Sequence, residues 1–256
     1  MKNKAAENSF QRIIALVIRE VKLNYKSFLL SSTIIFILLG LGDVIVLYNN
    51  PNEVTSGMGP NSLTQILFIW SLIWASLSFS ELISSSNKHF YLSLPASIGE
   101  KLVSKAVFFL ILIPLAFSVA YIIFMNLEFL VLNLGFNSRL VRSKQEWSVF
   151  FNSIPLLFLG VSCFFAGSIW QPKYSFFKTA LFGFILLIAT AALGFLIFRI
   201  IFYEHFDGFR IKENGLNFNI NMDHYFEHSW VKYTLFSLGL FFCYSFAYFK
   251  LKEKEI

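Results

Sequence analysis

Long runs of apolar residues, separated by short polar segments, limit what this chain can fold into. Of its 256 residues, 56% are apolar and 14% are charged, whereas a typical soluble domain carries about 25% charged residues. A helix needs roughly 20 mostly apolar residues to cross a bilayer, and the buried helices of soluble proteins have shorter runs. The sequence therefore predicts an all-α polytopic membrane protein with six transmembrane helices, an N-terminal amphipathic interfacial helix and a short cytoplasmic helix.

The predicted membrane domain covers residues 1–256 without a second domain. Its six spans are expected at about residues 28–48, 62–82, 102–125, 148–170, 174–202 and 230–249. Pro114 lies inside the third span and predicts a kink there. In the second span, Ser71, Ala75 and Ser78 share one helical side, which favours close packing against another helix, with the wall of a substrate path as the alternative.

Residues 9–26, ahead of the first span, have the pattern of an amphipathic helix. One side is apolar at helical spacing, and the opposite side carries Arg12, Arg19, Lys22 and Lys26. This pattern favours a helix in the headgroup layer with its basic face toward anionic lipid. The alternative is that these residues form the first turns of one long spanning helix.

The distribution of lysine and arginine predicts the orientation of the chain. With both termini in the cytoplasm, 14 of the 21 basic residues lie in or beside cytoplasmic segments. Basic residues near span ends favour the cytoplasmic side. Six spans place both termini on one side, so we expect a cytoplasmic N-terminus and a cytoplasmic C-terminus.

Motifs for enzymatic chemistry are missing from the sequence. It contains no HExxH, GxSxG, GxGxxG or GxxxxGK[ST] pattern. Ionisable residues in the spans are rare, and Asp43, Glu81 and Arg199 lie at span ends, where side chains reach the interface. Cys163 and Cys243 fall in apolar runs, as small hydrophobic residues rather than a disulfide. We therefore expect no intramembrane protease, no proton-coupled pump and no deep metal site.

One segment before the last span is a weak candidate for a metal site. It contains Asp223, His224, Glu227 and His228. His224 and His228 are four residues apart, so on a helix they would share a face and could bind zinc. The alternative is a solvated outer loop of ordinary polar residues, and the sequence favours that alternative.

The polar, basic segment Glu81–Lys105 lies between two apolar runs and is the main functional candidate. Ser97 and Glu100 fit the S-x-x-E capping box, which predicts a helix that starts near Ile98 and runs into the third span.

The residues before Pro95 predict a second, short helix in this segment. The stretch from Leu82 to Leu92 is half polar and contains aromatic residues, and it is expected to lie across the membrane face. Phe90 and Tyr91 would be interface anchors, Lys88 a charge, and His89 part of the contact surface. The alternative is a plain connector.

The stretch LSLPASIGEKLVSK, from Leu92 to Lys105, resembles the "lPvSr-x-e-x-l-x-x-K" pattern that opens the third span of type-2 ABC exporter permeases. The matching residues are Pro95, Ser97, Glu100, Leu102 and Lys105. Ile98 and Gly99 occupy positions where the family often has basic or polar residues, and Glu81 stands where related permeases often have an acidic residue. The expected architecture also resembles this family over nearly the whole chain.

The resemblance implies a transport subunit of a bacterial inner membrane. Two permeases, copies or paralogues, would pair in the bilayer, and each would dock a separate ATP-binding subunit that holds ATP and magnesium. The resemblance gives no cofactor to this chain and no nucleic-acid partner. The residues implied in ATPase coupling are Glu81, Lys88, His89, Phe90, Tyr91, Pro95, Ser97, Glu100, Lys101 and Lys105.

Two functions remain open from the sequence. The first is a permease that exports an amphipathic, lipid-like or peptide-like cargo, because the expected spans are almost free of charge. The second is a membrane-embedded enzyme or assembly scaffold that has no ATPase partner. An enzyme would need polar side chains that converge at one depth, and the sequence pattern predicts no such set.

Overall fold

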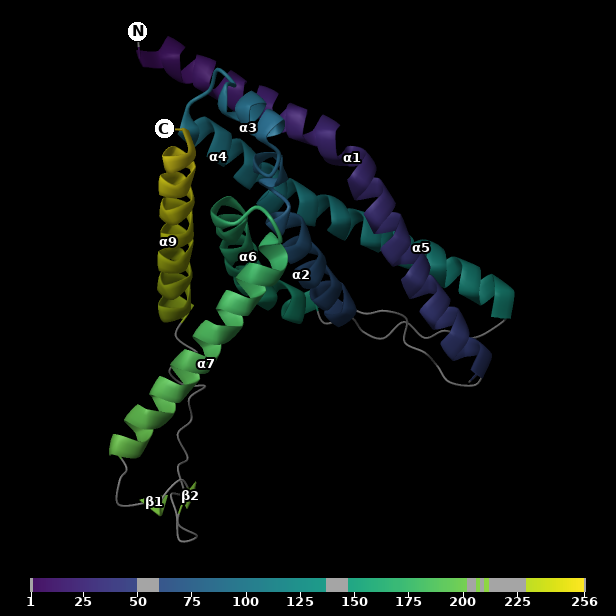
Figure 1. The fold of residues 1–256 in the computed structure, drawn as a ribbon. Helices are drawn as coiled ribbons and strands as arrows, with labels where there is room; N and C mark the ends of the chain where they lie inside the picture. Colours follow the sequence, from purple (N-terminus) through teal and green to yellow (C-terminus); the bar gives the residue numbers. More distant parts are fainter. Residues whose placement is uncertain are drawn as a thin grey trace.

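A computed structural model describes residues 2–49, 60–136, 147–201, 206–207, 210–211 and 229–255 (Figure 1). Helices form nearly all of these residues. Five helical stretches are long and apolar enough to cross a membrane: Ser9–Ile45, Ser62–Leu82, Ile98–Val131, Phe150–Trp170 and Ser175–Ile200. The architecture is therefore helical, with the long apolar helices of a multi-pass membrane protein.

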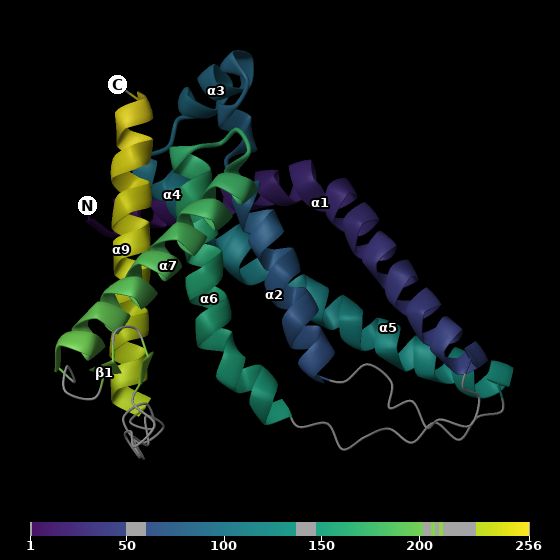
Figure 2. The same ribbon diagram turned by 60° about the horizontal axis from the view of Figure 1, so that its bottom comes forward.

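The first helix, α1 (Lys2–Asn49), is continuous, so the predicted division into 9–26 and 28–48 is wrong. No glycine or proline occurs between residues 20 and 39 that would end the helix. A helix of 48 residues rises about 72 Å, more than twice the roughly 30 Å of a bilayer's hydrocarbon core. Figures 1 and 2 show that α1 changes direction part-way along its length.

The second predicted span has the expected limits, Ser62–Leu82, but its last turns are irregular. Helix α2 (Pro60–Ser76) starts with proline, whose missing N–H costs nothing in a first turn. A turn and the 3₁₀ segment η1 (Ser80–Leu82) follow, and then the short helix α3 (Ser85–Leu92). The chain therefore does form a separate short helix before Pro95.

The third span is longer than predicted and carries an irregular segment. Helix α4 (Ile98–Ala106) starts at the predicted residue, the π-helical segment η2 (Val107–Leu112) follows, and α5 (Ile113–Phe136) completes it. The wide turns lie just before Pro114, whose ring would crowd the carbonyl of Leu110 in a regular α-helix. The predicted end of this span at residue 125 is wrong, because the apolar run continues beyond it and α5 ends at Phe136.

The remaining elements follow the predicted limits closely. Helix α6 (Trp147–Trp170) and helix α7 (Ser175–Ile201) are joined by a short turn. Strands β1 (Phe206–Asp207) and β2 (Arg210–Ile211) form a small antiparallel ribbon. Helix α9 (Ser229–Glu255) covers the predicted sixth span, but it is not one of the five helices found long and apolar enough to cross a membrane among the residues that the structure describes. The count of six spans stays a prediction.

The core lies around α6, which packs against α2, α7 and α9, while α1 packs against α4. Aromatic rings fill it: Trp70 stacks on Phe117 at 4.3 Å between centroids, and Phe79 meets Phe165 edge to face at 5.2 Å. The small-residue side of α2 packs against α6 as expected, since the hydroxyls of Ser78 and Ser168 lie 2.7 Å apart.

Candidate functional site

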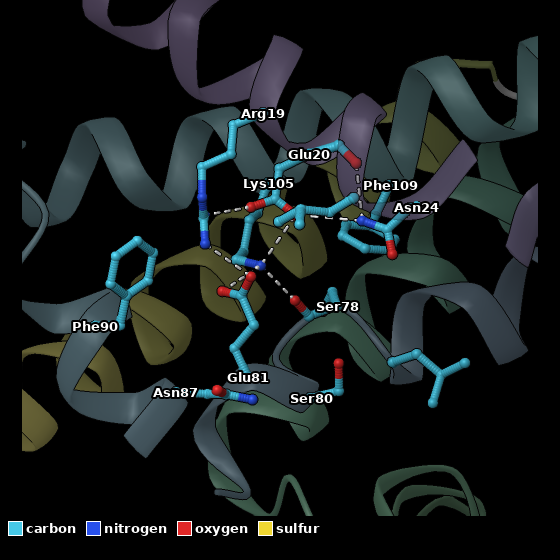
Figure 3. Close-up of a pocket in the computed structure, with 12 residues that line it drawn as sticks. Arg19, Glu20, Asn24, Ser78, Ser80, Glu81, Asn87, Phe90, Lys105 and Phe109 are labelled. Carbon is cyan, nitrogen blue, oxygen red and sulfur yellow. Dashed lines mark hydrogen bonds and ion pairs between the residues drawn. The ribbon is translucent and has the colours of Figure 1, made fainter. Parts of the chain in front are cut away.

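Four charged side chains from three parts of the chain converge beside the end of α2 (Figure 3). We call Arg19, Glu20, Glu81 and Lys105 the ion network. Arg19 bridges the two acids, with Nη1 3.2 Å from Glu20 Oε1 and Nη2 3.0 Å from Glu81 Oε1. Lys105 Nζ lies 3.3 Å from Glu20 Oε2 and 3.5 Å from Glu81 Oε2. The sequence pattern predicted no set of polar side chains that converge at one depth, and the ion network shows that this prediction is wrong.

Lys105 is the most enclosed member of the ion network, with 2% of its side chain exposed. Its ammonium donates a hydrogen bond of 2.7 Å to the Ser78 carbonyl. The rings of Phe79 and Tyr91 lie 5.2 and 5.0 Å from Nζ, within the range of cation–π attraction. Two carboxylates, a carbonyl and aromatic faces together compensate for the removal of this charge from water.

The ion network lines a pocket of about 340 Å³. Its polar wall also includes Asn24 and Asn87, and its apolar wall is formed by Leu23, Leu77, Phe90 and Phe109. The ion network contains two cationic and two anionic side chains, so their charges cancel. The pocket thus combines an apolar wall with a neutral set of paired charges, which suits an amphipathic group better than a simple ion.

A second ionic contact joins α1 to the start of α4. The predicted capping box is confirmed: Glu100 N–H donates to Ser97 Oγ at 3.2 Å, and Ser97 N–H donates to Glu100 Oε2 at 2.9 Å. The other carboxylate oxygen of Glu100 accepts from Arg12 Nη2 at 2.9 Å and from the hydroxyl of Ser9. One side chain therefore caps α4 and fastens α1 to it.

The predicted coupling residues divide into an inward set and an outward set. Glu81 joins the ion network, Tyr91 is 2% exposed in the core, and Lys101 Nζ donates to the Leu92 carbonyl at 2.8 Å. Of the two predicted aromatic anchors, Phe90 is exposed and Tyr91 is not, because α3 turns the Tyr91 ring toward Phe79. The outward side of this region carries His89, Phe90, Pro95 and Ser97.

Helix α3 lies near the end of α9, where basic side chains gather. Lys254 of α9 donates to the Ile169 carbonyl at the end of α6. Burial lowers the pKa of Lys254, and the like charges of Lys88 and Lys250 lower it further. Lys88 of α3 is therefore close enough to act on the C-terminal helix, and this end of the molecule is basic.

The weak metal candidate, His224 and His228, lies outside the described residues. Within the part of the chain that the structure describes, no three histidine, cysteine or acidic side chains come close enough to hold a metal ion.

Sequence reasoning missed the roles of Glu20, Arg12 and Arg19. The amphipathic pattern assigned both arginines to anionic lipid, whereas they pair with carboxylates of the same chain: Arg12 with Glu100, and Arg19 with Glu20 and Glu81. The available signal was Glu20 itself, the one acid between residues 9 and 26, next to Arg19 in a basic segment. An acid in that position indicates a protein partner rather than an anionic lipid surface.

Comparison with known proteins gives no match, since no family model, no curated protein and no solved structure corresponds to this chain.

Proposed function

We propose that this chain is the membrane-spanning permease subunit of an ATP-driven exporter of the ABC type. ATP hydrolysis takes place on a separate subunit that binds ATP and magnesium, in a bacterial inner membrane with both termini of this chain in the cytoplasm. The supporting observation is the position of α3. Phe90 on this helix is exposed, whereas Glu81 before the helix and Lys105 after it belong to the ion network.

The ion network supports a mechanical role for α3. Glu81 lies four residues before α3 begins and Lys105 lies thirteen residues after it ends, and both meet α1 through Arg19 and Glu20. A push on α3 by an ATPase subunit would be transmitted through these ion pairs to the long first helix. Arg19 also lies 5.7 Å from the centre of the Phe90 ring, so the outward anchor contacts the ion network directly.

The surface of α7 supports pairing with a second permease. Every side chain from residue 181 to residue 197 is exposed, and nearly all of them are apolar. A second copy or a paralogue packed along this helix, with lipid on the remaining surface, accounts for such a face. The cargo in this proposal is amphipathic, lipid-like or peptide-like, in keeping with the mixed lining of the pocket.

The same pocket favours a second candidate, a membrane-embedded enzyme or assembly scaffold without an ATPase. Polar side chains that converge beside a cavity are what a membrane enzyme requires, and Arg19, Glu81 and Asn87 meet that requirement. The two candidates differ in their partners, so they can be separated by what the protein binds.

The test is purification of the full chain from its native membrane in mild detergent, followed by mass spectrometry. A stoichiometric ATP-binding cassette subunit supports the permease, and a preparation without any ATPase supports the second candidate. In the complex, Phe90→Ala should lower cargo-stimulated ATP hydrolysis. Phe151→Ala is the matched control, since Phe151 is 61% exposed at the start of α6, whereas Phe90 is 62% exposed on α3. Equal activity of the two variants would remove α3 as the docking element.

A further inference from the structure

Asp43 and Glu128 face each other at the ends of α1 and α5 that lie away from the ion network. Figure 2 shows α1 and α5 converging toward this end. Asp43 lies 23 residues after Glu20, and Glu128 lies 23 residues after Lys105. That length of helix rises about 34 Å, close to the roughly 30 Å of the hydrocarbon core. The pair therefore lies near the opposite edge of the apolar layer.

Asp43 and Glu128 approach each other where α1 meets α5, because Glu128 Oε1 reaches the backbone of α1 beside Gly40, one turn before Asp43. Asp43 Oδ2 and Glu128 Oε1 are buried, and no donor in the described residues satisfies either atom. Gly40 allows the close approach of α1 and α5, since a Cβ atom there would lie 3.5 Å from the Phe124 ring and 3.7 Å from Glu128 Oε1.

Tyr121 adds a third polar group. Its side chain is 0% exposed, and its hydroxyl has no hydrogen-bond partner among the described residues. It lies seven residues before Glu128 on α5, so both side chains are on the same side of the helix.

Among the described residues, no cation forms an ion pair with either acid. The side chains of α2, which packs against α5, include no titratable group, and Tyr48 on α1 is 81% exposed. No ion pair to Asp43 or Glu128 exists in the described ranges. Two carboxylates this close repel each other strongly where water is scarce, and one bound proton removes the repulsion and supplies the missing donor.

We propose that Asp43 and Glu128 form a proton-binding site that holds one proton between the two carboxyl groups. The site does not depend on the proposed transport function. A divalent metal fits less well, because calcium takes six to eight oxygen ligands and magnesium needs a full octahedron, whereas this site offers two carboxyls and a phenol.

Dicyclohexylcarbodiimide provides the test, because it reacts with protonated carboxyl groups in apolar surroundings. The carboxyl oxygen bonds to the carbodiimide carbon, the acid proton moves to nitrogen, and acyl migration then gives a stable adduct. The full chain is reconstituted in lipid vesicles, labelled at several pH values and analysed by mass spectrometry. We expect an adduct on Asp43 or Glu128 at about pH 7, where an ordinary carboxyl is ionised, and its loss at higher pH.

Removal of either acid tests the pairing. In Glu128→Gln, labelling of Asp43 should fall by about tenfold at neutral pH, the size of one pKa unit, because the like charge that favours the neutral acid is gone. Asp43→Asn should do the same to Glu128. Glu253→Gln, on an exposed residue of α9, is the matched control and should change nothing.

Three results would overturn the proposal. The first is the absence of an adduct on both acids in the unmodified chain at every pH. The second is labelling that does not depend on the partner acid. The third is protection by excess sodium chloride at constant pH, which would assign the site to a metal cation. The first and third need no variant, so a folding defect in a variant leaves the test intact.

Discussion

A lysine with 2% of its side chain exposed cannot lose its partners without consequence. Lys105 lies between Glu20 and Glu81, and each of the three depends on the others for compensation of its charge. Removing one partner of a buried ion pair leaves an uncompensated charge, at a cost of about 3–5 kcal/mol.

We therefore expect Lys105→Met to lower the free energy of unfolding by about 3–5 kcal/mol. Thermal unfolding in detergent, followed by tryptophan fluorescence, measures this as a fall in midpoint temperature. Lys26→Met removes the same charge from an exposed position on α1 and should have little effect. Adding Glu20→Met to Lys105→Met should recover part of the loss, because the uncompensated acid is then gone. Equal midpoints for Lys105→Met and Lys26→Met would contradict a structural role for the ion network.

At the scale of single residues, sequence patterns predicted contacts between residues close in the chain and missed contacts between residues far apart in the chain. The capping box joins residues three apart, and its spacing specified both of its hydrogen bonds and the start of α4 at Ile98. The contact between Glu20 and Lys105 joins residues 85 apart. A helical pattern shows which side of a helix is polar, but it does not show what covers that side, so the charges of α1 were assigned to lipid.

At the scale of elements, the turn between α6 and α7 depends on one glycine. A Cβ atom added at Gly167 would lie 2.9 Å from Thr179 Cγ2 and 3.0 Å from Thr179 Cβ, closer than the two helices can tolerate without moving. Gly183, also on α7, has open space around it.

Gly167→Ala should destabilise the protein by about 1–3 kcal/mol through overpacking. Gly183→Ala should be neutral or stabilising by up to about 1 kcal/mol, because alanine favours helix. Thermal unfolding of both variants in the same detergent compares them directly. A Gly167→Ala variant as stable as Gly183→Ala would mean that α6 and α7 are not packed as closely as described.

The contact between α6 and α9 can be tested with the two native cysteines. Cys163 Sγ and Cys243 Sγ lie 3.6 Å apart as free thiols. Treatment with copper phenanthroline should join them within one chain, each thiol losing a proton and an electron to the oxidant. Peptide mass spectrometry without reductant detects the link, and Cys163→Ser should abolish it. Failure to form the link would argue against α9 lying along α6.

Element limits were predicted well where the apolar run alone determines the helix. Helices α6 and α7 end within one residue of their predicted limits, and Ser62–Leu82 agrees with the second span. The predictions were wrong where a helix continues through a change in surroundings. Helix α1 passes residue 27 without a break, and α5 passes Asn126. A helix can continue when its surroundings change from headgroups or water to lipid, because the residues on both sides of the change favour helix.

For the whole molecule, the length of α1 predicts an observable topology. About 20 residues of helix cross the bilayer, so Lys22 and Tyr48 should emerge on opposite sides. In a chain carrying Cys163→Ala and Cys243→Ala, Tyr48→Cys should react with an impermeant maleimide on intact cells. Lys22→Cys should react only after permeabilisation. Reaction of both from the same side would show that α1 does not span the membrane, and the reverse pattern would invert the predicted orientation.

The π-helical segment η2 amounts to one residue inserted into a helix that would otherwise run evenly from Ile98 to Phe136. Each residue of an α-helix turns the direction of later side chains by about 100°. In a regular α-helix the 23 residues from Lys105 to Glu128 would leave the two side chains about 140° apart, and the wide turns of η2 reduce this difference so that both face α1. Deleting Ile111, which is 47% exposed, would let the segment close into regular α-helix with Lys105 and Glu128 still on one side, because 22 residues of α-helix leave about 40° between them. The wide turns of η2 thus absorb one residue of length, and the two ends of the helix stay aligned although the chain between them is one residue longer than a regular α-helix of the same alignment.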